Sequence, residues 1–196
     1  IVGLGSLIFF STHLILFQKE RTMAVVGLFY GSDTGNTENI AKMIQKQLGN
    51  ELVDIRDIAK SSKEDIESYD FLLFGIPTWY YGEAQADWDD FFPTLEEIDF
   101  TDKLVGIFGC GDQEDYADYF CDAIGTVRDI VEPRGAIIVG NWPTDGYTFE
   151  SSKALLDDGN FIGLCIDEDR QPELTAERVE KWTKQIYDEM CLAELA

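Results

Sequence analysis

From residue 24 onward, five short apolar runs alternate with segments of helical periodicity, and no other feature of the chain limits its fold so strongly. The runs cover residues 24–30, 52–56, 71–76, 104–109 and 136–140. Most are nearly continuous in apolar residues, as expected for strands buried on both faces of a parallel sheet. Strands that alternate with helices build α/β folds. We therefore predict a doubly wound, five-stranded parallel sheet with helices on both faces.

The segments between these runs carry apolar residues at the three-to-four spacing of helices with one buried face. The first, fourth and last predicted helices carry the following apolar stripes: Ile40, Met43, Ile44 and Leu48; Phe120, Ala123, Ile124, Val127 and Val131; Val179, Trp182, Ile186 and Met190. We assign these side chains to the core rather than to a ligand site. The capping-box spacing of Ser61 and Glu64 predicts that a short second helix starts there.

Residues 141–174, between the fifth predicted strand and the last predicted helix, are too many for a bare connection. We expect this stretch to hold structure of its own, and residues 161–166 favour a small hairpin. The predicted fold is thus a parallel sheet with an insertion associated with strand five.

The chain of 196 residues, 45% of them hydrophobic, suits one well-filled core. We assign residues 23–196 to a single domain. Residues 1–17 are apolar, but the run is shorter than a spanning helix needs, and Lys19 and Arg21 follow it instead of preceding it as in a secretory signal. Because Met23 stands just before the first strand, residues 1–22 are predicted to be a spurious or artificial extension outside the fold. A membrane anchor and a disordered tail are the alternatives.

Acidic residues outnumber basic ones by 38 to 15, which gives a formal net charge of −23 at pH 7. Nucleic-acid phosphates and anionic lipids would repel such a chain, so we predict no nucleic acid and no membrane as partners of the folded domain. Basic proteins are the expected partners, and acidity that serves only solubility is the alternative. The cysteines have no metal-ligand spacing and predict buried free thiols in a reducing compartment, the cytoplasm; they are Cys110, Cys121, Cys165 and Cys191.

The run Gly-Ser-Asp-Thr-Gly-Asn-Thr lies at residues 31–37, between the first predicted strand and the first predicted helix. The first N–H groups of a helix lack partners within it and favour an anion, so this turn can hold a phosphate. A phosphate-transferring loop would carry a Lys, and the nearest cation here is Lys42. An ordinary capped helix start is the alternative. Further donors in the run are the hydroxyl groups of Ser32, Thr34 and Thr37 and the side-chain amide of Asn36. Gly35 has no side chain and lets the backbone approach the phosphate closely.

Two aromatic loops are predicted at the same edge of the sheet, where ligands of doubly wound folds bind. Pro-Thr-Trp-Tyr-Tyr-Gly follows the third predicted strand at residues 77–82, and Cys-Gly-Asp-Gln-Glu-Asp-Tyr follows the fourth at residues 110–116. Three consecutive aromatic residues cannot all turn inward, so at least one should face the cleft. A phosphate loop beside two aromatic loops is what flavin mononucleotide (FMN) requires, because its phosphate needs donors and its ring needs flat apolar walls.

Three motifs together resemble the flavodoxin family: Thr-Gly-Asn-Thr after the first strand, Thr-Trp-x-x-Gly after the third and Gly-Asp-Gln-x-x-Tyr after the fourth. Residues 23–196 are similar to a long-chain bacterial flavodoxin throughout, and residues 143–167 match the long-chain insertion in size and position. The resemblance implies a flavodoxin-like fold and non-covalently bound FMN. It implies these FMN-binding residues: Ser32, Asp33, Thr34, Gly35, Asn36, Thr37, Pro77, Thr78, Trp79, Tyr80, Tyr81, Gly82, Cys110, Gly111, Asp112 and Tyr116.

The resemblance also implies roles within this set. Residues 32–37 would hold the phosphate through backbone N–H and hydroxyl groups, and Trp79 and Tyr116 would stack on opposite faces of the ring. Gly111 and Asp112 would contact the pyrimidine edge.

The peptide between Tyr80 and Tyr81 corresponds to the one that turns its carbonyl toward the flavin on reduction in this family. A glycine is common there, and a tyrosine should disfavour the turned form because non-glycine residues resist positive φ. We therefore expect only modest stabilisation of the one-electron-reduced flavin.

Charge then suggests how such a protein would work. Full reduction of FMN would place a negative charge near flavin N1, in a site that we expect to have no nearby Lys or Arg. One carboxylate about 10 Å away would oppose that charge by roughly 1.7 kcal/mol at an effective dielectric constant near 20. We expect a monomeric, low-potential one-electron carrier between basic redox proteins, such as a flavodoxin/ferredoxin-NADP reductase and acceptor enzymes. The carboxylates that flank the two aromatic loops are Glu83, Asp87, Asp89, Asp90, Asp112, Glu114, Asp115 and Asp118.

An enzymatic function is not expected. The single histidine, His13, lies in the extension, so the domain has no imidazole for acid-base catalysis, and no catalytic or metal site is predicted. An FMN-dependent NAD(P)H:quinone reductase of the same fold is the main alternative. A phosphoryl-receiving regulator on the same type of sheet is a second alternative, but it requires an Asp at the end of the third strand, where this chain has Gly-Ile-Pro. A non-redox binding module is the third alternative, and it would take up no FMN.

Overall fold

The computed structural model describes residues 25–192. The extension predicted at residues 1–22 lies outside the described residues, so only the folded part of the domain assignment can be compared with the structure. Among residues 25–192, no helix combines the length and the apolar character needed to cross a membrane.

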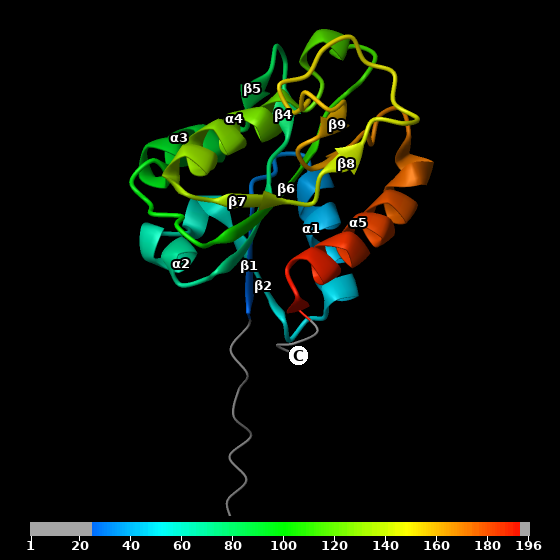
Figure 1. The fold of residues 1–196 in the computed structure, drawn as a ribbon. Helices are drawn as coiled ribbons and strands as arrows, with labels where there is room; N and C mark the ends of the chain where they lie inside the picture. The colour runs from blue at the N-terminus through cyan, green and yellow to red at the C-terminus, as the bar shows by residue number, and fades with distance from the viewer. Residues whose placement is uncertain (1–24, 193–196) are drawn as a thin grey trace, which may run out of the picture.

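A parallel sheet forms the middle layer of the molecule (Figure 1). Its strand order is β2-β1-β3-β6, and two further strands, β7 and β10, both pair with β6 on its outer side. Every pairing in this sheet is parallel. The prediction of a doubly wound parallel sheet is therefore confirmed. The strands are β1 (Val26–Tyr30), β2 (Val53–Asp57), β3 (Phe71–Gly75), β6 (Leu104–Cys110), β7 (Ile137–Val139) and β10 (Leu164–Ile166).

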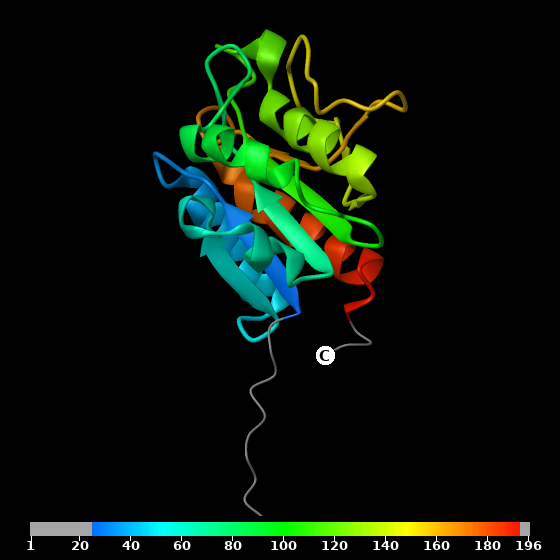
Figure 2. The same ribbon diagram turned by 90° about the vertical axis from the view of Figure 1, so that its left-hand side faces the viewer.

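Helices cover both faces of the sheet (Figures 1 and 2). The helices α1 (Asn36–Leu48) and α5 (Thr175–Glu189) pack side by side on one face. The other face carries α2 (Lys63–Glu67), α3 (Ala86–Leu95) and α4 (Asp122–Val131). Short 3-10 turns lie at Ile58–Lys60, Ala117–Tyr119, Glu132–Arg134 and Pro172–Leu174.

The fifth position of the sheet is filled by two strand segments rather than one. The first segment, β7, pairs with residues 104–106, and β10 pairs with residues 108–110 of the same neighbour. The hairpin expected at residues 161–166 is wrong. The completely buried β10 pairs with β6 in the main sheet. Phe161 instead pairs with Trp142 in the small antiparallel pair of β8 (Trp142–Pro143) and β9 (Asn160–Phe161). The insertion therefore interrupts strand five instead of following it.

The start of α2 differs by one residue from the prediction. The capping box is formed by Ser62 and Asp65, each of whose side chains accepts a hydrogen bond from the other residue's backbone N–H. Ser61 cannot serve, because its hydroxyl donates to the Asp57 carbonyl at 2.8 Å and closes the preceding 3-10 turn. Both serines have an acidic residue three positions later, so spacing alone did not separate them.

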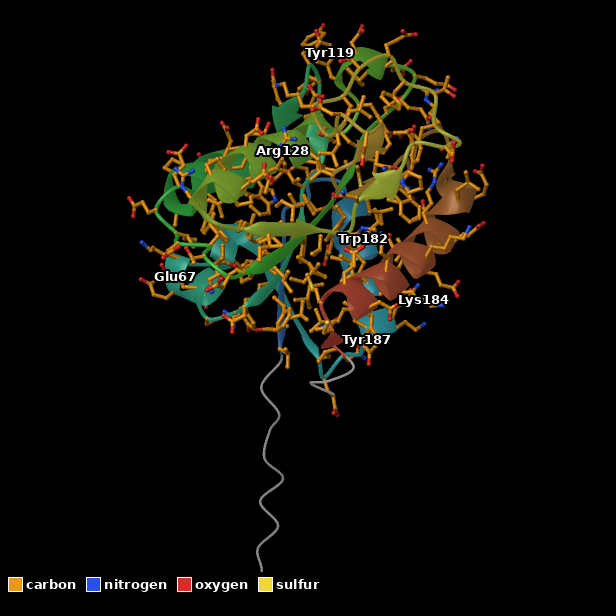
Figure 3. The ribbon with its side chains drawn as sticks, in the orientation of Figure 1. Glu67, Tyr119, Arg128, Trp182, Lys184 and Tyr187 are labelled. Carbon is orange, nitrogen blue, oxygen red and sulfur yellow. The ribbon has the colours of Figure 1, made fainter. Side chains whose placement is uncertain are left out.

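One continuous apolar core fills the two spaces between the sheet and its helices. The predicted core positions are buried, except that Met43 is only partly buried at the edge of the core. On the α5 side, Trp182 lies completely buried between helix and sheet (Figure 3), and its indole N–H donates to the Gly140 carbonyl at 2.7 Å. This contact fixes the end of β7, where the insertion begins.

Candidate functional site

A cavity of about 410 Å³ lies beyond the carboxyl ends of the central strands. Four segments line it: the loop after β1, the loop after β3, the loop after β6 and the turn after β10. The lining residues are Ser32, Asp33, Thr34, Asn36, Thr37, Pro77, Thr78, Trp79, Tyr80, Cys110, Gly111, Asp112, Tyr116, Tyr119, Glu168 and Asp169.

The loop after β1 is held from below by the sheet. The Gly31 N–H donates to the Gly75 carbonyl at 3.0 Å, and that carbonyl also accepts the indole N–H of the buried Trp88 at 2.8 Å. A side chain at position 31 would collide with the Trp88 ring, since a Cβ there would lie 2.6 Å from it. Only a glycine therefore lets the chain turn this close to the tryptophan.

The turn leaves several donors available at the start of α1. Gly35 adopts a left-handed conformation with φ 91°, and its N–H donates to the Ser32 hydroxyl oxygen at 3.1 Å. The N–H groups of Asn36 and Thr37 have no acceptor among residues 25–192, as expected for the first turn of a helix. The Thr34 hydroxyl is likewise unpaired within this part of the chain and lines the cavity. These uncharged donors suit an anion such as a phosphate.

A neutral thiol and a hydrogen-bonded carboxylate lie at this end of the cavity. Burial raises the pKa of the Cys110 thiol well above its ordinary value, so the thiol stays neutral, and it accepts a hydrogen bond from the Thr37 hydroxyl at 3.6 Å. The carboxylate of Asp33 accepts a hydrogen bond from the side-chain amide of Gln85 at 3.0 Å.

The loop after β3 is a tight hairpin between β4 (Thr78–Trp79) and β5 (Glu83–Ala84). The Thr78 hydroxyl oxygen accepts the Ala123 N–H at 3.1 Å, which ties the hairpin to α4. Trp79 lines the cavity, and its indole N–H is buried without an acceptor among the described residues.

Of the two tyrosines at the tip of the hairpin, one lines the cavity and the other does not. Tyr80 lines the cavity and has φ 44°, a conformation that costs a non-glycine residue energy. Tyr81 is 72% exposed and does not line the cavity. Its ring meets the rings of Tyr119 and Tyr116 edge-on, at centroid distances of 5.7 and 6.5 Å (Tyr119 is labelled in Figure 3).

The loop after β6 carries Tyr116 and is organised by Asp112. The Asp112 carboxylate accepts the N–H groups of Glu114 and Asp115, both at 2.9 Å, and both of its oxygens accept hydrogen bonds from Arg170 at 3.1 Å. Partial burial opposes ionisation of Asp112, but these hydrogen bonds outweigh it and hold its pKa below the ordinary value. The sequence-based expectation that no Lys or Arg lies near the site is therefore wrong.

The structure brings together most, but not all, of the predicted ligand residues. Gly35, Tyr81 and Gly82 do not line the cavity: Gly35 shapes the turn, and Gly82 is buried against the side chain of Asp122. The others do line it, although their contact with a cofactor stays a prediction.

Sequence patterns did not indicate four residues at or near the cavity: Tyr119, Glu168, Asp169 and the nearby Arg170. Three of these follow β10, which was expected to belong to a hairpin. A sequence signal existed, because an apolar run followed by an acidic turn repeats the pattern seen after the fourth predicted strand.

Together, the fold and the cavity define an α/β protein with a donor-rich turn and an aromatic-walled site at the carboxyl edge of its sheet. Comparisons with known proteins agree with this class. The family model described as Flavodoxin matches residues 28–182. A flavodoxin of Haemophilus influenzae is 91% identical over 174 residues, which cover 89% of this chain and all of that protein. Flavodoxin 1 of Escherichia coli K12 is 76% identical over 173 residues, covering 88% of this chain and 98% of that protein.

A solved structure gives the same result. The crystal structure of Fusobacterium nucleatum flavodoxin bound to flavin mononucleotide superimposes with a TM-score of 0.79 at 38% sequence identity, covering 84% of this chain and 97% of that one. The chain belongs to the flavodoxin family, whose members are FMN-containing electron carriers rather than enzymes.

Proposed function

We propose that this protein carries single electrons at low potential, using FMN bound without a covalent link in the cavity described above. FMN supplies the one-electron chemistry, and the protein supplies binding, orientation and electrostatics. The observation that carries the proposal is the pairing of unoccupied N–H and hydroxyl donors at the start of α1 with two aromatic loops across the same cavity.

The phosphate end of FMN would lie against residues 32–37. The free N–H groups of Asn36 and Thr37 and the hydroxyl of Thr34 would donate to phosphate oxygens, and the dipole of α1 would favour the anion. No Lys or Arg lines the cavity among the described residues, so phosphate binding would depend on neutral donors.

The ring end would lie between Trp79 and Tyr116, which line the cavity from the loops after β3 and β6. Both rings keep part of their surface exposed instead of joining the core; Tyr116 is 37% exposed. Gly111 and Asp112 would meet the pyrimidine edge of the ring through their backbone groups.

A low potential would follow from the acidity of this end of the molecule. Full reduction adds negative charge to the flavin, and Asp112, Glu114, Asp115, Glu168 and Asp169 lie on the loops that border the ring site. Each carboxylate opposes that charge, with an effect that salt weakens.

The redox partners would be basic proteins, such as a flavodoxin/ferredoxin-NADP reductase and acceptor enzymes. Two features support this: the formal net charge of −23, and the exposed tyrosines 80, 81 and 116 beside those acidic loops. A small, transient interface between a monomeric carrier and its partner would suffice for electron transfer. The free thiols of Cys110, Cys121 and Cys165 are buried, and the prediction of burial is wrong for Cys191, which is exposed. The buried free thiols suit the reducing cytoplasm.

An anaerobic redox titration of the purified protein, after reconstitution with FMN, tests this proposal. We expect a flavin absorption spectrum and a potential for the second electron well below that of free FMN. A potential near that of free FMN would contradict the low-potential function, and absence of FMN uptake would contradict the cofactor. Sustained NADPH-to-quinone turnover by the protein alone would instead support the quinone reductase.

A further inference from the structure

Arg170, in the turn after β10, holds three carboxylates of the loop that carries Tyr116. Its Nε and Nη2 donate to the two carboxylate oxygens of Asp112, each at 3.1 Å. Its Nη2 also lies 2.5 Å from Asp115 Oδ2, and its Nη1 lies 3.5 Å from Glu114 Oε2. The fork geometry with Asp112 is one that arginine, but not lysine, can make.

The turn that carries Arg170 is itself anchored to the end of the sheet. The Arg170 N–H donates to Asp167 Oδ1 at 2.9 Å, while Asp167 Oδ2 accepts the backbone N–H and the side-chain amide of Gln113. Asp167 is completely buried and Gln113 nearly so. The loop after β6 and the turn after β10 are thus joined twice, once through Asp167 and Gln113 and once through Arg170 and Asp112.

These two segments form adjacent walls of the cavity. Gly111, Asp112 and Tyr116 line it from one segment, and Glu168 and Asp169 line it from the other. Arg170 does not line the cavity. Any effect it has on a bound ligand must therefore act through the position of these walls and through its charge.

No other cation among the described residues compensates the carboxylates that Arg170 contacts. Within residues 25–192, Arg170 is the one cation that forms ion pairs with Asp112, Glu114 and Asp115. Removing Arg170 would leave three carboxylates without a compensating charge on this loop. The same loop carries Tyr116, which is proposed to stack on the flavin.

We propose that Arg170 is a positioning residue for bound FMN: it fixes the Tyr116 loop against the turn after β10 and, by its charge, limits how far the acidic loop lowers the potential for the second electron. The inference rests on the proposed FMN site. It predicts separate effects of geometry and of charge, and these can be measured on two variants.

The test compares Arg170→Gln, Arg170→Lys and the unchanged protein, with the FMN dissociation constant and the two one-electron potentials as readouts. For Arg170→Gln we expect FMN to bind about tenfold more weakly. We also expect the equilibrium constant for the second electron to fall by up to about tenfold, which is ~59 mV for one electron. Arg170→Lys keeps the charge but loses the fork, so it should restore the potential more fully than the affinity.

Arg128→Gln is the matched control, because Arg128 on α4 pairs with Asp129 and Glu132 away from the cavity lining (Figure 3). It should leave both readouts unchanged, and far-ultraviolet circular dichroism should find every variant folded. The inference fails if Arg170→Gln matches the unchanged protein in both readouts, or if Arg128→Gln shifts the potential equally, which would indicate an effect of net charge alone. If the unchanged protein takes up no FMN, the proposed function is wrong, and the inference about Arg170 is then wrong as well.

Discussion

The carboxylate of Asp167 accepts two hydrogen bonds from Gln113, one from its backbone N–H at 3.0 Å and one from its side-chain amide at 2.9 Å. The side-chain oxygen of Gln113 in turn accepts the N–H of Thr148 at 2.5 Å. One buried glutamine thereby connects the end of β10, the loop that carries Tyr116 and the insertion.

Asp167→Asn should lower the free energy of unfolding by about 2 kcal/mol, because an amide cannot accept from all the donors that surround this buried carboxylate. Urea unfolding of the FMN-free protein measures the change. Asp158→Asn is the control, since exposed Asp158 accepts, within the described part of the chain, only the Asn160 N–H in a surface turn. Equal losses for both variants would mean that the Asp167 network adds no more to stability than the surface turn at Asp158.

Thr34→Val should weaken FMN binding about tenfold and leave riboflavin binding unchanged. The hydroxyl of Thr34 lines the cavity and has no partner in the described part of the chain, and a hydrogen bond to a charged group contributes about 1.5 kcal/mol or more. Fluorescence titration with the two flavins measures both constants. Thr126→Val on α4, outside the cavity lining, should change neither. A parallel loss for riboflavin would place the effect away from the phosphate.

Trp79→Ala should weaken the binding of both FMN and riboflavin by tenfold or more, because stacking on a flat ring contributes roughly 1–3 kcal/mol. Tyr81→Ala, at the tip of the same hairpin, should have a much smaller effect, since Tyr81 is mostly exposed and does not line the cavity. The same titration ranks the two variants. The opposite order would show that Tyr81, and not Trp79, covers the ring.

Tyr69→Phe should make unfolding depend less on pH above pH 10. Burial, together with the hydrogen bond from the Tyr69 hydroxyl to Asp54 at 2.6 Å, raises the pKa of Tyr69 from 10.0 to about 12. Because the folded pKa is the higher one, the contribution of Tyr69 is complete below pH 10 and is lost as the pH rises toward 12.

Urea unfolding at a series of pH values checks the Tyr69 prediction. The Phe variant should be less stable than the unchanged protein by about 1 kcal/mol at pH 8, and this difference should disappear between pH 10 and pH 12. Tyr187→Phe on α5, where the tyrosine is only half-buried (Figure 3), is the control and should run parallel to the unchanged protein. A constant gap between the curves of the Tyr69 variant and the unchanged protein would contradict the assigned pKa.

Thr183→Val should stabilise the protein by about 1 kcal/mol. The Thr183 hydroxyl on α5 is buried without a partner among residues 25–192, so an apolar group of the same shape removes a desolvation cost. Thr183→Ser keeps the hydroxyl and loses the methyl group, and it should destabilise the protein. Thermal unfolding of both variants and the unchanged protein tests this prediction. A valine variant less stable than the unchanged protein would mean that the Thr183 hydroxyl has a hydrogen-bond partner in solution.

Much of the fold could be predicted because its strands are buried on both faces and carry few polar residues. Residues 26–30 and 71–75 are examples in which burial alone accounts for the apolar run. Start positions were less certain: Ser61 and Ser62 have equivalent spacing, and the choice between them depends on a hydrogen bond to the Asp57 carbonyl that sequence does not reveal.

The site was predictable where a motif follows a recognised strand and was not where the strand was missed. Trp79 and Tyr116 were placed at the cavity by the strands before them. Glu168 and Asp169 were not, because the three-residue β10 was too short to be identified as part of the main sheet. Arg170 escaped notice because its partners lie 55 or more residues earlier in the chain.

The interrupted fifth strand has a consequence for protein engineering. Along β6, Gly106 pairs with Val139 of β7 and Phe108 pairs with Leu164 of β10. Only the pairing position opposite Ile107 therefore separates β7 from β10. A glycine flanks that gap on either side, Gly140 before it and Gly163 after it. Joining Val139 to Leu164 through one glycine would preserve the alternation of side chains along the ladder, so both ends of the insertion lie in register with the strand that leads to Asp167.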